Sequence, residues 1–423
     1  MATPNIIIVI THDTGRHLSF YGLPNVPSPN LAHLANEGII FDSAFCTSPL
    51  CSPSRGSLIT GRYPHSNGLI GLAHRGWSLY PSEKTLGEFL HECGYETLLF
   101  GLQHETIDPN VLSRRYEHIY HAKSNSAIDV APLVSEFLLQ RDSSIKKKPF
   151  FAMIGFVETH RPYEDFKPAD PEKVHIPNYL TDFPEVRKDL AMFYGSIRTA
   201  DTGVGGIIRA LDSTSFMEDT IFIYTTDHGI PFPRAKSTLY DPGLEISLII
   251  RWPAFISKPK ICHEMISNVD LLPTLLEIVD IPIPKEVQGK SLLSLIKEDK
   301  YNSREEIYAE KTYHNAYDPI RCIRTSRYKY IYNFRKLEKR FELPRDIEAS
   351  LSAQILGSEY YSPRPTEELY DLQEDPWETI NLIDKSKYDE VASVLRNKLM
   401  KWLEETNDPI LLGDIPPTPE QYK

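Results

Sequence analysis

The chain has 423 residues, of which 41% are hydrophobic and 25% charged, and its formal net charge is −12. This composition is that of an ordinary globular protein and excludes disorder, collagen and coiled coil as the main state. The acidic balance argues against nucleic acid or an anionic membrane as the main partner. An anionic substrate would therefore have to be bound by a locally basic pocket.

Five cysteines at wide spacings, with no CxxC pair, argue against a zinc knuckle and favour a reducing compartment. No basic segment followed by a long apolar run opens the chain, and the apolar run 150–157 is less than half a membrane span. We therefore expect a soluble cytoplasmic protein.

Apolar runs alternate with amphipathic segments in the first 300 residues. In chain order, the sequence predicts a strand at 6–10, a short helix capped by Asn30, a helix at 85–93, strands at 97–100 and 150–156, a helix at 194–211, strands at 221–225 and 246–250, and a helix at 270–279. Buried strands that alternate with helices predict an α/β fold with a mainly parallel central sheet and helices on both faces.

The pattern changes after residue 300. Short, half-polar strands are predicted at 307–309, 322–325 and 328–333, followed by a helix at 388–404 with Val391, Leu395, Leu399 and Trp402 on one stripe. This favours a small C-terminal antiparallel α+β subdomain, with domains at 1–305 and 306–423. We expect residues 335–366, which are charged and have weak periodicity, to form an ordered excursion.

Histidine and aspartate residues directly follow four of the predicted strands. They are His12 and Asp13, His104, His160, and Asp227 and His228. Because ligands of open parallel sheets bind at the carboxyl ends of strands, we expect these side chains to share one site.

Two of these turns carry metal-ligand types. Asp13 and Asp227 supply carboxylates, and His12 and His228 supply imidazoles. Oxygen ligands favour Ca²⁺ or Mg²⁺, whereas added imidazole moves the preference toward Mn²⁺ or Zn²⁺. The alternative is that the aspartates only cap the helices that follow them.

The segment 51–61, CSPSRGSLITG, is the most specific in the chain. Cys51 could be a buried residue before a capped helix, or a thiol whose pKa is lowered by a helix N-terminus and by Arg55. The segment resembles the sulfatase signature Cys-X-Pro-X-Arg with Leu-Thr-Gly downstream. Further segments resemble that family in the expected order, over essentially the whole chain: PNIIIVITHDTG, ETHRPY, TTDHG, DLLPTLLEIVDI and ELYDLQEDPWETINL.

The resemblance implies the alkaline-phosphatase-like sulfatase fold and hydrolysis of sulfate esters or sulfamates. Within the family, HSNGLIGLAHRG, GIPFPRAKSTLYDPG, the TYH at 312–314 and EETNDP resemble the heparan N-sulfatase (N-sulfoglucosamine sulfohydrolase) group. The implied substrate is a sulfated carbohydrate or an aryl sulfate. The implied metal is Ca²⁺, with Mn²⁺ as the alternative, and a maturation enzyme would convert Cys51 to formylglycine.

The resemblance also implies residue roles. In the hydrated aldehyde at position 51, one hydroxyl would attack sulfur and the other would later expel sulfate. Arg55 would stabilise this diol, and His104 would anchor or deprotonate it. His160 would protonate the leaving group or hold a sulfate oxygen, and Lys236 would bind sulfate. Substrate contacts are expected from His314 and Arg161.

Two positions depart from the family pattern. His12 stands where the family usually has a first aspartate, and Leu102 stands where it usually has a lysine. Either another basic residue, such as Arg16, Arg75 or Arg161, replaces that lysine, or activity is weaker or directed differently. The alternatives are a phosphodiesterase or phosphonate monoester hydrolase on the same fold, and a degenerate sulfated-sugar-binding protein. The intact signature residues Cys51 and Arg55 argue against a degenerate sugar-binding protein.

Overall fold

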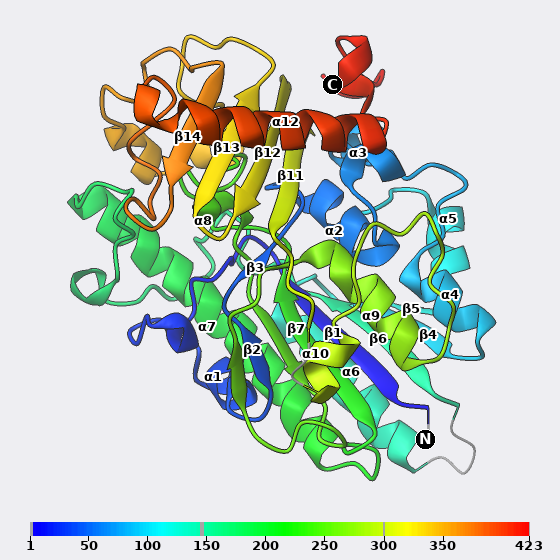
Figure 1. Cartoon of the computed structure of the whole chain (residues 1–423). Coiled ribbons are helices and arrows are strands. Elements are labelled where there is room, and N and C mark those ends of the chain that lie inside the picture. The colour runs from blue at the N-terminus through cyan, green and yellow to red at the C-terminus, as the bar shows by residue number, and fades with distance from the viewer. Residues whose placement is uncertain (1–2, 144–147, 299–300, 423) are drawn as a thin grey trace.

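The computed structural model describes residues 3–143, 148–298 and 301–422. An eight-stranded sheet with the order β5-β4-β6-β1-β7-β8-β2-β9 lies at its centre (Figure 1). Its strands are β1 (Asn5–Thr11), β2 (Ile39–Phe41), β4 (Glu96–Gly101), β5 (His118–Tyr120), β6 (Phe150–Gly155), β7 (Thr220–Thr226), β8 (Leu248–Arg251) and β9 (Lys260–Cys262). β8 runs antiparallel to both of its neighbours, and the other pairings within this sheet are parallel. The predicted mainly parallel sheet is confirmed.

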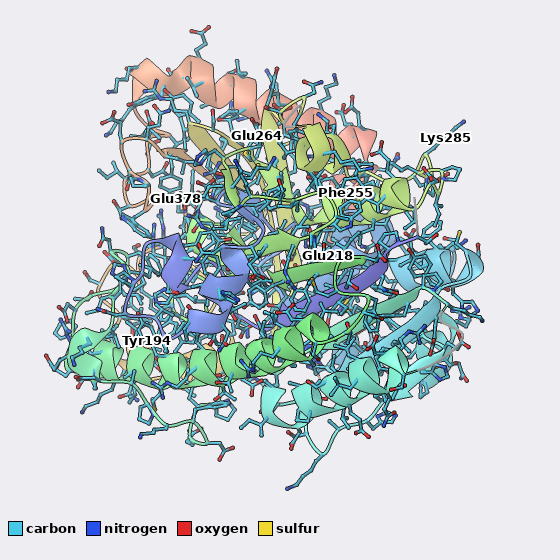
Figure 2. The ribbon with its side chains drawn as sticks, turned by 90° about the horizontal axis from the view of Figure 1, so that it is seen from below. Tyr194, Glu218, Phe255, Glu264, Lys285 and Glu378 are labelled. Carbon is cyan, nitrogen blue, oxygen red and sulfur yellow. The ribbon has the colours of Figure 1, made fainter. Side chains whose placement is uncertain are left out.

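Helices cover both faces of this sheet because its central strands are apolar on both sides. Ile6 and Ile8 of β1 belong to a buried cluster with α2 (Cys51–Thr60), α4 (Leu86–Glu92), α9 (Leu271–Ile278) and α10 (Leu293–Glu298). Ile7 and Val9 point to the opposite face, toward α1 (Pro29–Ala35), α6 (Ala127–Asp142) and α7 (Pro184–Asp212). The long α7, which carries Tyr194, lies beside α6 in Figure 2. Shorter elements are β3 (Ala44–Phe45) paired with β10 (Ile266–Ser267), α3 (Pro64–Asn67), α5 (Pro109–Arg115) and α8 (Asp241–Leu244).

A second, antiparallel sheet follows in the C-terminal part of the chain. It contains β11 (Glu306–Tyr313), β12 (Tyr317–Thr325), β13 (Tyr328–Asn333) and β14 (Glu367–Asp371). α12 (Asp389–Glu405) lies across it, with Leu395, Leu399 and Trp402 buried (Figure 1). Residues on the other face, Cys322 among them, join the core of the large sheet. The predicted C-terminal α+β unit is thus confirmed, while the domain limit at 305 stays a prediction.

Several predicted boundaries differ from the structure. The first short helix begins at Pro29, whose fixed φ suits a first helical position, so Asn30 is not its cap. The side chain of Asn30 instead donates to Asp201 Oδ2, 2.7 Å away on α7. α7 begins at Pro184 rather than at residue 194 because Val186 and Leu190 extend its buried face. The helix predicted at 85–93 is confirmed: Thr85 caps α4 through a capping box with Glu88.

The excursion between β13 and β14 is ordered, as predicted, and contains α11 (Arg345–Glu348). Within the described part of the chain, no helix is both long and apolar enough to span a membrane. The five cysteines are all free thiols.

Candidate active site

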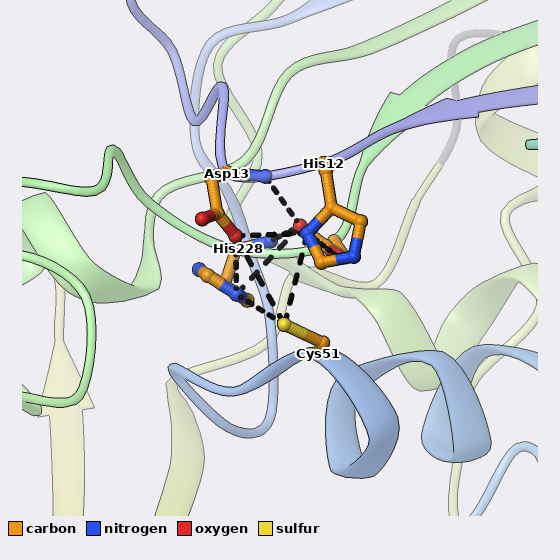
Figure 3. Close-up of side chains that lie close together, drawn as sticks. His12, Asp13, Cys51 and His228 are labelled. Atoms are coloured by element: carbon orange, nitrogen blue, oxygen red, sulfur yellow. Dashed lines mark hydrogen bonds and ion pairs between the residues drawn. The ribbon is translucent and has the colours of Figure 1, made fainter. Parts of the chain in front are cut away.

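Cys51 is the first residue of α2, a helix buried on all sides. Its Sγ lies 3.4 Å from His228 Nε2 and 3.7 Å from His12 Nδ1 (Figure 3). Asn268 fixes the first turn of the helix by donating to the carbonyl of Ser54 at 3.0 Å. The helix therefore aims the cysteine at the carboxyl ends of β1 and β7.

The four predicted metal ligands meet Cys51 in one buried cluster. His228 Nε2 lies 3.0 Å from Asp13 Oδ1, and His12 Nδ1 lies 3.3 Å from Asp227 Oδ2. The backbone N–H of Asp13 donates to Asp227 Oδ1 at 2.8 Å. Asp13 has a φ of 46°, in the left-handed region that non-glycine residues seldom adopt. The turn after β1 thus holds its carboxylate against the turn after β7.

This donor set fits a divalent cation. His228 Nδ1 lies 3.0 Å from the carbonyl oxygen of Gly229, which can only accept, so Nδ1 carries a proton. In the neutral ring, Nε2 then presents a lone pair toward Asp13 and Cys51. Two buried carboxylates and two imidazoles are the ligand types that divalent metals take in proteins, and one positive ion would neutralise both acids.

Strong electrostatic coupling shifts the pKa values of the cluster. Burial alone would lower the pKa of His12, but the carboxylates of Asp227 and Asp13 and the charge at Cys51 raise it to about 9. Burial opposes ionisation of Asp13 as well, but Lys236 and His228 hold the pKa of that carboxyl well below its usual range. Burial likewise opposes ionisation of the Cys51 thiol, yet His12 and Lys236 lower its pKa strongly. Position 51 therefore lies in a field that stabilises negative charge.

Two predicted cations contact these acids. Arg55 Nε lies 3.1 Å from Asp227 Oδ2, while its buried Nη2 has no hydrogen-bond partner among the described residues. Lys236 Nζ lies 2.6 Å from Asp13 Oδ2. The backbone N–H of Ser237, which donates to the carbonyl of Pro49 at 3.1 Å, ties the lysine turn to the segment just before Cys51.

The two remaining predicted catalytic histidines border the cluster. His104 Nδ1 lies 3.1 Å from His12 Nε2. The ring of His160 lies 4.9 Å from that of His12, centroid to centroid, and its Nδ1 contacts the carbonyl of Arg161. Burial lowers the pKa of both His104 and His160, and for His160 the charge of Lys236 adds to this effect.

Asp346, from α11, is a site residue that sequence reasoning missed. Its Oδ2 lies 3.1 Å from Lys236 Nζ and 3.9 Å from His160 Nε2. Burial would raise the pKa of its carboxyl, but the charge of Lys236, its hydrogen bond and the charge of His160 together lower it. Asp346 stands in a charged segment with weak periodicity, and no local motif identifies it.

Leu102 is buried and donates its backbone N–H to the carbonyl of Gly155 at 2.9 Å. Two of the arginines proposed to replace a lysine here are already paired. Arg16 binds Glu245 at 2.7 Å, and Arg161 binds both oxygens of Asp189 at 2.7 and 2.8 Å.

The guanidinium of Arg161 is therefore engaged by the protein itself, and its role in substrate binding stays a prediction. His314 is almost fully buried, and burial together with Lys236 lowers its pKa to about 3. It is a neutral imidazole near the site, and its role in substrate choice also stays a prediction.

Comparison with known proteins gives a consistent assignment. The Sulfatase family profile matches residues 4–281, and the profile "N-sulphoglucosamine sulphohydrolase, C-terminal" matches residues 232–349. An ulvan-active sulfatase of Formosa agariphila is 30% identical over 423 aligned residues, covering 96% of this chain and 81% of the relative. The N-sulphoglucosamine sulphohydrolase of Homo sapiens is 27% identical, covering 96% and 91% of the two chains.

Solved structures share the fold. One, in complex with its substrate D-glucosamine-2-N,6-O-disulfate, has a TM-score of 0.75 at 18% identity and covers 96% of this chain and 98% of its own. A 2-O GAG sulfatase has a TM-score of 0.73 at 21% identity, covering 100% and 96%. With a family match over more than half of its length, the chain belongs to the sulfatase family and is a sulfuric ester hydrolase or sulfohydrolase.

Proposed function

We propose that this enzyme removes sulfate from a sulfated saccharide, using formylglycine formed from Cys51 and one divalent metal. The observation that carries the proposal is the position of Cys51 at the start of α2, with Sγ within 4.0 Å of His12, Asp13 and His228. Support for the substrate class comes from the relatives, an ulvan-active sulfatase and an N-sulphoglucosamine sulphohydrolase, and from the neighbour with bound disulfated glucosamine. O-sulfate and N-sulfate both fall within this class.

Formylglycine at position 51 would supply the nucleophile, and a divalent metal would supply part of the positive charge that binds the sulfate group. Oxidised to formylglycine and hydrated, residue 51 supplies a hydroxyl nucleophile. His12, Asp13, Asp227 and His228 would hold a divalent metal, which would supply positive charge that stabilises the sulfate group and lowers the pKa of a hydroxyl. Ca²⁺ is the metal we propose, with Mn²⁺ as the rival because two of the four donors are imidazoles.

Arg55 and Lys236 would bind the anionic group. Arg55 is oriented by Asp227 and keeps the buried donor Nη2 for an oxygen at the site. The acids around Lys236 outweigh its burial and raise its pKa well above the ordinary value, so it stays charged. Because the net charge of the chain is −12, these local cations, rather than long-range attraction, must bind sulfate.

His160 would donate the proton that the leaving group takes up. Its Nδ1 faces the carbonyl of Arg161 and therefore carries a proton, so Nε2 is the atom that gains or loses one. Asp346 lies 3.9 Å from Nε2, where a carboxylate favours the protonated ring during leaving-group departure. His104, whose Nδ1 lies 3.1 Å from His12 Nε2, would accept a proton, since burial lowers its pKa and favours the neutral imidazole.

A turnover screen tests the proposal. Sulfated monosaccharides, with N-sulfoglucosamine included, are compared with an aryl sulfate and an aryl phosphate diester, using wild-type protein and Cys51→Ser. We expect turnover of a sulfated sugar that the Cys51→Ser protein loses, because serine cannot expel sulfate once it has been transferred. Preferential turnover of the phosphate diester would instead support the phosphodiesterase alternative, and binding without turnover would support the degenerate sugar-binding protein.

The proposal also implies a maturation enzyme as a partner, because an unmodified thiol carries neither of the two hydroxyls that hydrated formylglycine would provide. Its target would be the segment that begins at Cys51 and includes Pro53 and Arg55. The cytoplasmic location stays a prediction.

A further inference from the structure

The guanidinium of Arg161 is enclosed by the protein, and each of its three nitrogens donates a hydrogen bond. Nη1 and Nη2 donate to the two carboxylate oxygens of Asp189 on α7, at 2.7 and 2.8 Å. Nε donates to the carbonyl of Pro231 at 2.9 Å. The charged group also lies over the rings of Tyr163 and Phe232, 4.8 and 4.9 Å from their centroids. Paired donors in a fork of this kind fix the orientation of both partners.

Asp189 binds a second segment as well. Its carboxylate is fully buried, and its Oδ2 accepts from the hydroxyl of Ser352 at 2.6 Å and from the backbone N–H of the same residue at 3.2 Å. Ser352 is buried and belongs to the excursion between β13 and β14, which also carries Asp346 on α11. One buried carboxylate therefore joins Arg161 to the segment that delivers Asp346.

His160 lies between these two connected segments. Its Nδ1 contacts the carbonyl of Arg161, which can only accept, so this contact fixes the tautomer and the rotation of the ring. Its Nε2 lies 3.9 Å from the carboxylate of Asp346. The imidazole thus has Arg161 on one side and the excursion on the other, and Asp189 connects the two.

The same guanidinium also reaches the segment that follows β7. Pro231, which accepts from Arg161, lies between His228 and Lys236 in the chain. Arg161 therefore ties the turn of His160 to the segment that supplies a candidate metal ligand and the sulfate-binding lysine. A displacement of a catalytic group by about 1 Å can cost about 100-fold in rate, so contacts that fix these segments relative to one another matter for catalysis.

We propose that Asp189 and Ser352 are positioning residues, which act through Arg161 to hold His160 where its Nε2–H can donate a proton to the leaving atom. The proton passes from Nε2 to the oxygen or nitrogen of the leaving group as its bond to sulfur breaks. In this role the guanidinium of Arg161 acts on His160 rather than on the substrate. The inference rests on the proposed function, in which His160 serves the leaving group, and deepens it.

Two leaving groups of different basicity test this role. Asp189→Asn and Ser352→Ala are assayed on a sulfated sugar, whose leaving group needs a proton, and on nitrophenyl sulfate, whose phenolate leaves without one. For Asp189→Asn we expect kcat on the sugar to fall about 100-fold, with KM and the turnover of nitrophenyl sulfate changed by less than about 3-fold. Ser352→Ala should show a smaller fall with the same selectivity. Equal losses on both substrates, or a loss through KM, would overturn the inference.

A matched control separates positioning from stability. Asp201 is a buried carboxylate on the same helix, but it accepts from the backbone N–H groups of Asn30 and Leu31 instead of an arginine. Asp201→Asn should lower the melting temperature without any selectivity between the two substrates.

A double variant gives a second separation. Asp189→Asn leaves the charge of Arg161 buried without its partner, whereas Arg161→Gln/Asp189→Asn removes that charge. The double variant should therefore regain part of the lost stability, while kcat on the sugar stays low. Recovery of kcat together with stability would overturn the positioning role.

A measurement without turnover separates this inference from the proposed function. Nitrogen NMR of histidine-labelled, full-length Cys51→Ala protein, with His160 assigned through His160→Gln, reports the tautomer of the ring. We expect a single form with the proton on Nδ1, which Asp189→Asn converts to a mixture and Asp201→Asn leaves intact. This result supports the positioning role even if wild-type protein hydrolyses none of the sulfates. An unchanged His160 signal in Asp189→Asn would overturn it, whatever the enzyme hydrolyses.

Discussion

The ammonium group of Lys236 contacts a carboxylate that also belongs to the candidate metal site: its Nζ lies 2.6 Å from Oδ2 of Asp13. The same nitrogen lies 3.1 Å from Asp346 in the C-terminal part of the chain. The lysine thus connects the metal turn after β1 with α11, and its orientation depends on both parts of the fold.

Removal of this cation should impair catalysis. Lys236→Ala is expected to lower kcat/KM by about 100-fold or more, because a buried cation aimed at charge that develops in the transition state is typically worth about 3 kcal/mol. Steady-state kinetics on a sulfated sugar measure the effect, with the exposed Lys188→Ala on α7 as control. Near wild-type rates in a folded Lys236→Ala protein would mean that other residues bind sulfate.

Cys51 should be found as formylglycine when the protein is produced in a host with the maturation machinery. Conversion of the thiol to an aldehyde lowers the mass of the peptide that contains residue 51 by about 18 Da. Mass spectrometry of the digested protein measures this directly. Fully active protein with an unmodified Cys51 would contradict the formylglycine mechanism and favour a thiol nucleophile.

Asp227 should be required for metal binding. Its carboxylate accepts from the backbone N–H of Asp13 and lies 3.3 Å from His12 Nδ1, so it is held among the other candidate metal ligands. Metal analysis of purified wild type should find one divalent ion per chain, and Asp227→Ala should lose it. Asp219→Ala, which changes an aspartate just before β7, is the control. Equal metal content in wild type and Asp227→Ala would place the metal elsewhere.

Asp318 should make stability depend on acid pH. Its carboxylate lies 2.7 Å from Lys311 Nζ and 2.7 Å from Arg364 Nη2. Burial opposes its ionisation, but the two cations lower its pKa to about 2. Because the folded-state pKa lies below the unfolded value, the stabilisation is complete above about pH 4 and is lost as the pH falls toward 2, by about 2 kcal/mol.

Asp318→Asn should lose this part of the acid dependence and destabilise the fold at pH 7 by about 3 kcal/mol, since it leaves buried cations unpaired. The exposed pair Lys401–Glu405 provides the control, because Glu405→Gln should cost less than about 0.5 kcal/mol. Denaturant unfolding at pH values from about 2 to about 7 measures both free-energy changes, because this range includes the pKa of Asp318 in the folded and in the unfolded protein. Parallel acid profiles for wild type and Asp318→Asn would contradict the assignment.

Local pattern predicted most elements of the large sheet. The β-branched run of β1 and the capping box of α4 specify their structures within a few residues of sequence. The N-terminal part of α7 and all of β14 were not predicted. Their identity depends on partners: Val186 and Leu190 are buried against distant residues, and β14 is defined by its pairing with β13.

The sequence by itself determined which side chains reach the edge of the sheet, because residues that follow parallel strands must emerge there. This holds for His12, Asp13, Asp227 and His228, and the signature segment identified Cys51. Only the tertiary structure decided which charges are paired. Asp346 reaches Lys236 across 110 positions of the sequence, and Arg161 is paired with Asp189. Such pairings depend on how distant segments fold back onto one another, which neither periodicity nor local motifs encode.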